Sequence, residues 1–181
     1  MIPTILFDMI RYFRDDAKRI NHAMKVYSFA HTICCSENIH GIKQDIIELA
    51  AILHDIGIKE AEKKYHSTAG NYQEIEGPPI ARQILAMRGI SPEVIDRVCY
   101  LIGNHHSYAK IDDSDFQILV EADFLVNIFE DDMPVKSIES IYKKYFQTGS
   151  GKEILTTMYL NNTSDSFGST PLNPPASGGK R

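Results

Sequence analysis

The sequence predicts an all-α fold, and three observations carry that prediction. Apolar residues recur every three or four positions through most of the first 160 residues, which is the spacing of amphipathic helices. No segment shows the strict alternation of apolar and polar residues that marks a half-buried strand. Helix-start signals such as Ser91-Pro92-Glu93 precede several of the periodic segments. A chain of 181 residues is long enough for one domain with its own core, which we place at residues 1–160.

The N-terminal third is predicted to form three helices. The first places Met9 and Phe13 on one apolar face, and Asp16 suits the start of the second. Gly57 follows the third and breaks it. Their expected ranges are residues 3–13, about 16 to 37, and 42–53.

The stretch after the third helix is predicted to be a loop. Residues 59–76 are mostly charged or polar, and such a loop beside a site can hold substrate. Proline is tolerated in the first turn of a helix, so Pro78 and Pro79 indicate the start of a helix that runs to about Met87. Further helices are expected at residues 92–102, 116–129, about 134 to 146, and between Gly151 and Leu160.

Charge and hydropathy exclude several classes of partner. The chain carries 19 basic and 24 acidic residues, a net charge of −5, and it has no basic stripe of the kind that binds a nucleic-acid duplex. No apolar run approaches the roughly 20 residues of a membrane span, and the N-terminus lacks the features of a signal peptide. We therefore predict a cytoplasmic protein with neither a nucleic-acid nor a membrane partner.

The cysteines and the C-terminal composition give two further expectations. Cys34, Cys35 and Cys99 are odd in number and lie in apolar helical patterns, so we predict reduced thiols that are buried or half-buried. From Asn161 onward the chain is rich in Asn, Ser, Gly and Pro and poor in large apolar residues. Such a segment cannot repay the entropy of ordering, so residues 161–181 are predicted to be a disordered tail.

The most informative stretch is Leu49 to Gly57, in which His54 and Asp55 lie side by side at the end of an apolar run. Burying an imidazole and a carboxylate is costly unless they are hydrogen-bonded or bind a metal. A His-Asp pair occurs by chance often enough that it carries weight only together with other polar residues on apolar helix faces.

Three further groups meet that condition: His22, the pair His105-His106, and Asp123. For His22 taken alone, a buried imidazole satisfied by a backbone carbonyl remains an alternative. Together the groups predict a metal site in the helical interior. Mixed imidazole and carboxylate ligands suit Fe, Mn, Co, Ni or Zn, and the absence of Cys ligands argues against a closed structural zinc site. Asp55 has two oxygens and is therefore able to bridge two ions.

The order of these residues resembles the HD superfamily of metal-dependent phosphohydrolases, and His54-Asp55-Ile56-Gly57 spells its HDIG variant. The resemblance covers roughly residues 15–130. It implies an all-helical HD-domain bundle with the metal site in its core. It also implies a first metal held by His22, His54, Asp55 and Asp123.

Members with two metals add a histidine ahead of a Gly-x-x-x-A helix and another in the segment that matches I-G-N-H-H-S. Glu76 stands where we expect the first of these, so we predict Glu76 as an oxygen ligand or a general base. For the other position His106 is the first choice and His105 the second. The expected cofactor is therefore one or two divalent ions.

The resemblance implies phosphoester hydrolysis, in which a metal lowers the pKa of bound water and polarises a phosphoryl oxygen. We predict Asp55, Lys59 and Glu76 as catalytic residues. Arg19, Lys25 and Lys59 are predicted to bind phosphate oxygens. The expected substrate is a nucleotide or another small phosphorylated metabolite. Two alternatives stay open here: an HD-type di-iron oxygenase, and a non-catalytic HD module that binds a ligand.

Overall fold

The computed structural model describes residues 1–160, and the tail predicted at residues 161–181 lies outside the described residues. Residues 1–160 form helices and short connections without any strand, so the predicted all-α class is confirmed. None of the helices in this part of the chain combines the length and the hydropathy that a membrane crossing requires.

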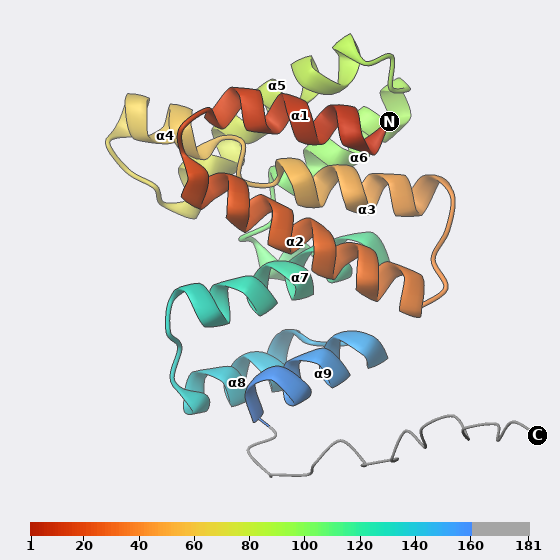
Figure 1. Ribbon diagram of the computed structural model, residues 1–181, viewed down its shortest axis with the longest axis vertical. Helices are drawn as coiled ribbons and strands as arrows, with labels where there is room; N and C mark the ends of the chain where they lie inside the picture. Colours follow the sequence, from red (N-terminus) through yellow and green to blue (C-terminus); the bar gives the residue numbers. More distant parts are fainter. Residues whose placement is uncertain (161–181) are drawn as a thin grey trace, which may run out of the picture.

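The helices follow one another with short connections (Figure 1). Most lie close to the ranges that the sequence predicts, and Asp16 caps the second by accepting a hydrogen bond from the Arg19 N–H. In order the elements are α1 (Ile2–Phe13), α2 (Ala17–Ser36), α3 (Ile42–Leu53), α4 (Ile58–Tyr65), α5 (Gly70–Met87), α6 (Pro92–Ile102), the 3-10 turn η1 (Tyr108–Lys110), α7 (Ser114–Glu130), α8 (Val135–Tyr145), α9 (Gly149–Leu155) and the π-helical turn η2 (Thr156–Leu160).

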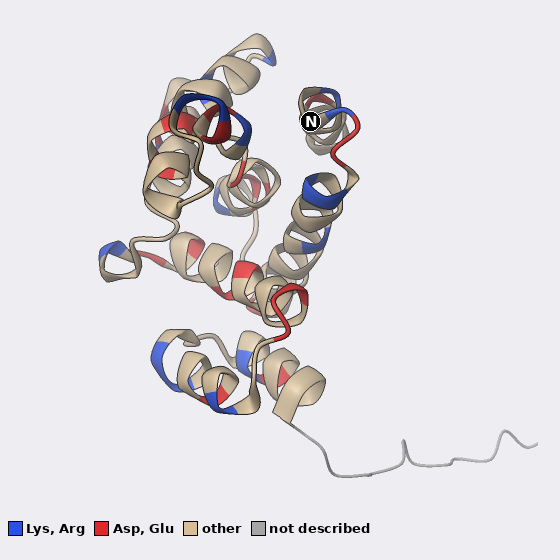
Figure 2. Ribbon diagram, turned by 90° about the vertical axis from the view of Figure 1, so that its left-hand side faces the viewer, with Lys and Arg blue, Asp and Glu red and all other residues tan. Residues whose placement is uncertain are grey.

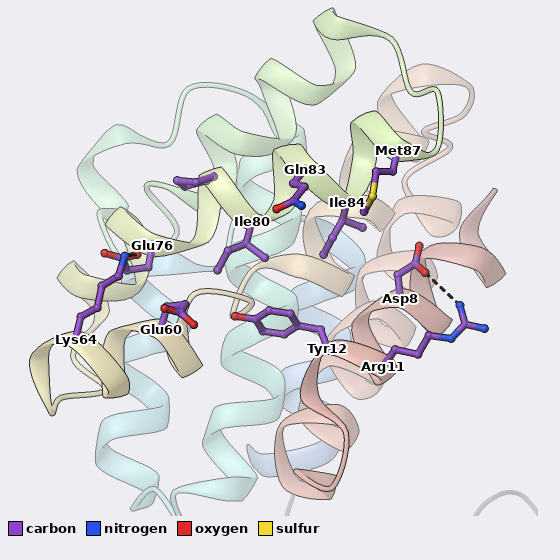
Figure 3. Close-up of a pocket in the computed structure, with 11 residues that line it drawn as sticks. Asp8, Arg11, Tyr12, Glu60, Lys64, Glu76, Ile80, Gln83, Ile84 and Met87 are labelled. Carbon is purple, nitrogen blue, oxygen red and sulfur yellow. Dashed lines mark hydrogen bonds and ion pairs between the residues drawn. The ribbon is translucent and has the colours of Figure 1, made fainter.

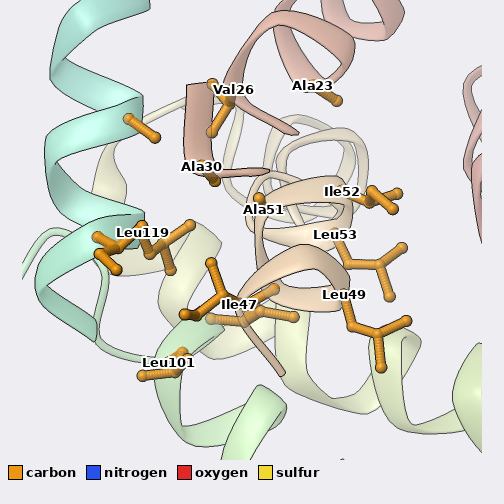
Figure 4. Close-up of a cluster of buried hydrophobic side chains, with 14 of the residues drawn as sticks. Ala23, Val26, Ala30, Ile47, Leu49, Ala51, Ile52, Leu53, Leu101 and Leu119 are labelled. Atoms are coloured by element: carbon orange, nitrogen blue, oxygen red, sulfur yellow. The ribbon is translucent and has the colours of Figure 1, made fainter. Parts of the chain in front are cut away.

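The central helix of the bundle is α3. Its residues from Ile47 to Leu53 are all buried, because α2, α6 and α7 pack around it. Aliphatic side chains from these helices fill the space between them (Figure 4). Buried alanines such as Ala30 and Ala51 let α2 and α3 approach closely. The C-terminal end of α3, which leads to His54 and Asp55, is thereby brought into the interior.

A second layer lies beyond α7, where α8 and α9 pack against its other side (Figure 1). Glu121 of α7 is fully buried and fastens the connection between these two helices. Its carboxylate accepts hydrogen bonds from the backbone N–H groups of Gln147 (2.6 Å) and Thr148 (2.9 Å). The Thr148 hydroxyl and the Gln117 side-chain amide also donate to it. A Cβ at position 151 would collide with this carboxylate, so Gly151 is required there.

The loop predicted at residues 59–76 is wrong, because α4 and the first turns of α5 occupy it. The eight residues of α4 are mostly charged, and its apolar stripe consists of Ile58, Ala61 and Tyr65 alone, so the composition of this short helix resembles that of a loop.

The predicted start of the next helix is also wrong, since Pro78 and Pro79 lie inside α5. Proline removes a hydrogen bond from a helix interior. Gly77 and Ala81, which flank the proline pair, are both buried. Their packing against neighbouring helices stabilises α5 on either side of the prolines.

Charged residues are spread over the bundle. Lys and Arg positions are interleaved with Asp and Glu positions on several helices (Figure 2). Arg97, for example, pairs with both Asp112 and Asp115.

Candidate metal centre

Four separate parts of the chain bring six histidine and aspartate side chains to one place in the bundle. They come from α2, from the turn after α3, from the turn after α6, and from α7. All but two are buried, and those two are half-buried. The six are His22, His54, Asp55, His105, His106 and Asp123.

These side chains form two groups. In one, ligand atoms of His22, His54 and Asp123 lie within 4.8 Å of one another, and in the other the same holds for Asp55, His105 and His106. Asp55 faces both groups.

Its Oδ2 atom lies 3.6 Å from Nε2 of His22 and 3.6 Å from Nε2 of His54. Its Oδ1 atom lies 3.5 Å from Nε2 of His105. One carboxylate therefore presents one oxygen to each group, which is the arrangement of a bridging ligand.

The imidazole rings are fixed so that their Nε2 lone pairs face this centre. Nδ1 of His54 and Nδ1 of His105 lie 2.9 and 2.8 Å from backbone carbonyl oxygens three positions earlier. A carbonyl can only accept, so Nδ1 carries the hydrogen and Nε2 of the neutral ring is an acceptor. Nδ1 of His22 lies 3.0 Å from the Glu130 carboxylate, which fixes that ring in the same way.

This donor set demands a cation. Nε2 of His22 and Nε2 of His54 lie 3.1 Å apart, and Oδ1 of Asp123 lies 3.3 Å from the former. Burial lowers the pKa of His22, but Asp123, Asp55 and Glu130 outweigh it and raise the pKa to about 9. The surroundings of His22 thus favour a positive charge at this point. The spacings also match the edges of a coordination polyhedron with bonds of about 2.1 Å, so these residues fit a metal ion.

The second group also fits an ion. The Nε2 atoms of His105 and His106 are buried and have no hydrogen-bond partner among the described residues. Burial lowers the pKa of His106 to about 4, and the neighbouring His105 contributes to this shift. The His106 ring is therefore neutral near pH 7 and able to ligate. A Cβ at position 70 would collide with this ring, so Gly70 at the start of α5 makes room for it.

The centre opens onto two adjoining cavities of about 280 and 330 Å³. Their shared lining includes His22 and Asp55, together with Thr68, Asn127 and Asp131. A small molecule bound in either cavity would therefore lie next to the His and Asp side chains of the centre.

Among the residues at this site that were not predicted from the sequence are Glu130 and Gln73. Glu130 lies seven positions after Asp123, two turns along the same face of α7, and that spacing is a signal that could have found it. Gln73 lines one cavity, and its Nε2 donates to the Thr68 carbonyl at 2.8 Å. Its Oε1 is buried and has no hydrogen-bond partner within residues 1–160. No sequence signal identified Gln73, because its segment was predicted to be a loop.

The structure does not bring Glu76 to the ligands, which corrects the expectation that it binds the second ion. Its carboxylate accepts hydrogen bonds from Lys64 (2.5 Å) and Tyr65 (3.0 Å). It lines a separate pocket of about 540 Å³ between α1, α4 and α5, across from Tyr12 (Figure 3). The physical reason is that α5 begins at Gly70, so Glu76 lies inside the helix, on a face that meets α4.

Lys59 is also placed away from the centre. Its Nζ donates to the Tyr12 carbonyl at 3.2 Å and lies 5.5 Å from the centre of the Tyr12 ring. The predicted catalytic and phosphate-binding roles of Lys59 are therefore corrected, because its helix turns it toward α1.

The other two predicted cations lie nearer. Arg19 lines a cavity of the centre and is held by Asp16 (2.9 Å) and Glu62 (2.6 Å). Lys25 instead donates to Oε1 of Glu130 at 2.9 Å, so it meets the site only through the carboxylate that orients His22.

Comparison with known proteins identifies the family of this chain. The family model for the HD domain matches residues 19–144. The chain belongs to the HD-domain family. None of the curated proteins matches the sequence.

One solved structure resembles this HD domain in fold. It is the crystal structure of a predicted HD superfamily hydrolase from an uncultured Thermotogales bacterium. It is 22% identical in sequence with a TM-score of 0.64, and the match covers 86% of this chain and 83% of that one.

Replacing Glu130 with Gln should weaken metal binding by the HD domain about 10- to 100-fold, because the neutral amide holds the His22 ring less firmly in the ligating tautomer. Titration of the ion-free protein with a divalent metal measures this. Glu139→Gln is the matched control on exposed surface of α8. Equal affinities for the wild type and Glu130→Gln would contradict the orienting role.

Proposed function

We propose that this HD domain is a metal-dependent phosphohydrolase that acts on a nucleotide or another small phosphorylated metabolite. One observation carries the proposal: Asp55 offers one oxygen to each of two His/Asp groups beside an accessible cavity. The solved structure with the same fold is described as a predicted HD superfamily hydrolase, and this description supports hydrolysis as the reaction class.

A divalent ion held by these residues would supply a Lewis acid and a water of lowered pKa. The protein supplies the rest. Nδ1–H donation by His54 and His105 keeps their rings aimed at the centre without reorganisation. Arg19 places a positive charge at the cavity for a phosphate oxygen, and its two carboxylate partners hold the guanidinium in position.

Oε1 of Gln73, for which the described part of the chain offers no hydrogen-bond partner, is a further group for substrate or bound water. Asn127 of α7 adds a second amide to the cavity lining. The Thr68 carbonyl accepts a hydrogen bond from the Gln73 amide and fixes that side chain. Together they give the cavity hydrogen-bonding groups that are able to orient a small polar substrate.

The number of ions is tested by a pair of substitutions. His106→Ala should lower the metal content from about two equivalents to about one, since it removes a ligand of one group only. Glu76→Ala should leave the content unchanged, because Glu76 pairs with Lys64 in another pocket. Metal analysis of both variants after identical purification is the measurement. A loss in Glu76→Ala would contradict the placement of this residue.

The reaction class is tested with protein purified without chelator. We expect metal analysis to show bound Fe, Mn, Co, Ni or Zn, and we expect phosphate release from some members of a panel of nucleotides and sugar phosphates. Oxygen consumption with a mixed-valent iron signal would instead identify an oxygenase. Tight ligand binding with no turnover of any panel member would identify a non-catalytic module.

A further inference from the structure

A second cluster of reactive side chains lies at the far end of α2, away from the metal centre. Cys35 is exposed in the last turn of this helix, contrary to the sequence prediction of a buried or half-buried thiol. Its Sγ lies 3.7 Å from Nε2 of His31, one turn earlier on the same face.

A carboxylate from α3 holds the histidine from the other side. Nδ1 of His31 lies 2.8 Å from Oε1 of Glu48, which is buried. Gln44 donates to the same oxygen at 2.8 Å and fixes it in place. The Glu48 oxygen accepts from Nδ1–H, so Nε2 of His31 is left to accept the proton of the Cys35 thiol. Cys35 is thus the nucleophile, His31 the base, and Glu48 the group that orients the base.

The other two cysteines lack this arrangement. Cys34 and Cys99 are buried and donate to backbone carbonyl oxygens at 3.3 and 3.4 Å. Burial raises the pKa of Cys34 to about 11, which keeps its thiol protonated and unreactive. The chain therefore holds one exposed thiol with a base and two internal controls.

We propose that Cys35 is a modification site at which the thiol forms a mixed disulfide with a low-molecular-weight disulfide. The Cys35 sulfur attacks one sulfur of the small disulfide while His31 accepts the thiol proton. A new S–S bond forms, the old one breaks, and the second half leaves as a thiolate that takes up a proton. Cys35 is oxidised, and one molecule of the small disulfide is reduced to the leaving thiol and the bound half.

The adduct leaves the metal centre free. At about 1.5 Å per residue, Cys35 lies about 20 Å along α2 from His22. Metal content of the modified protein should therefore equal that of the unmodified protein, which separates this proposal from the proposed phosphohydrolase function.

Incubating the folded full chain with glutathione disulfide near pH 7, followed by intact mass and peptide mapping, tests the proposal. We expect one glutathionyl adduct, located on the peptide that contains Cys35, and no adduct on the Cys35→Ser variant. His31→Ala should slow the reaction about tenfold or more, as loss of a general base does, and added imidazole should restore part of the rate. His40→Ala is the matched control, an exposed histidine beyond the end of the same helix, and should react like the wild type.

Glu48→Gln keeps the shape of the carboxylate but weakens its hold on His31, so its rate should fall between those of His31→Ala and the wild type. Far-UV circular dichroism checks that each variant is folded. Adducts spread equally over Cys34, Cys35 and Cys99 would overturn the proposal. So would a His31→Ala rate equal to that of the wild type in a folded protein.

Discussion

Asp55→Ala is expected to abolish metal binding and to lower phosphate release at least about a hundredfold, while the fold survives. The carboxylate presents one oxygen to His22 and His54 and the other to His105, so both groups lose a ligand in a single substitution. The side chain borders two cavities and is half-buried, so its loss should not disrupt packing. Metal analysis and circular dichroism on the same sample measure both outcomes.

Asp96→Ala is the control for this variant. Asp96 is an exposed aspartate on α6 that pairs with Arg82 on the surface, and its removal should change neither metal content nor activity. A folded Asp55→Ala protein that retains the wild-type number of ions would contradict the assignment of Asp55 as a shared ligand.

Glu121→Ala is expected to lower the free energy of unfolding by about 3 kcal/mol, because it removes the buried carboxylate that accepts hydrogen bonds from Gln117, Gln147 and Thr148. For a domain of this size the midpoint of thermal unfolding should fall by roughly 6–12 °C. Glu121→Gln keeps one acceptor oxygen and should lose less. Thermal and urea unfolding measure the difference.

Glu153→Ala, an exposed glutamate on α9, is the control and should shift the midpoint little. If Glu121→Ala unfolded at the temperature of the wild type, the connection between α8 and α9 would have to be held by something other than this carboxylate.

The helices that could be predicted from the sequence are those that bury a continuous apolar stripe, as α1 does with Ile5, Met9 and Phe13. The helix that could not is α4, whose apolar positions are Ile58, Ala61 and Tyr65 among charged residues. Periodicity reports burial over several turns, so a helix of two turns offers too few buried positions to be told from a charged loop.

The same distinction explains the site. His22 and Asp123 were predictable because each is a polar residue on an otherwise apolar face, a position that needs a partner. Glu76 was misplaced because its position depends on where α5 begins, and the proline pair gave a false start. Gln73 was missed for the same reason, since its approach to the cavity exists only once α5 extends back to Gly70.

The position of Glu121 and Asp123 on α7 has a thermodynamic consequence. The His/Asp centre gathers residues that lie far apart in the sequence, and an unfolded chain cannot hold them together. An ion that binds the centre therefore binds the folded state alone. Its binding free energy adds to the free energy of unfolding of α2, α3, α6 and α7. The layer of α8 and α9 is joined to α7 by the hydrogen bonds of Glu121 and by buried apolar side chains such as Phe146 and Leu155. Helix α7 therefore belongs to both parts of the molecule. The stability of the helices around the His/Asp centre should rise with the concentration of free metal, whereas the contacts of α8 and α9 involve no ion.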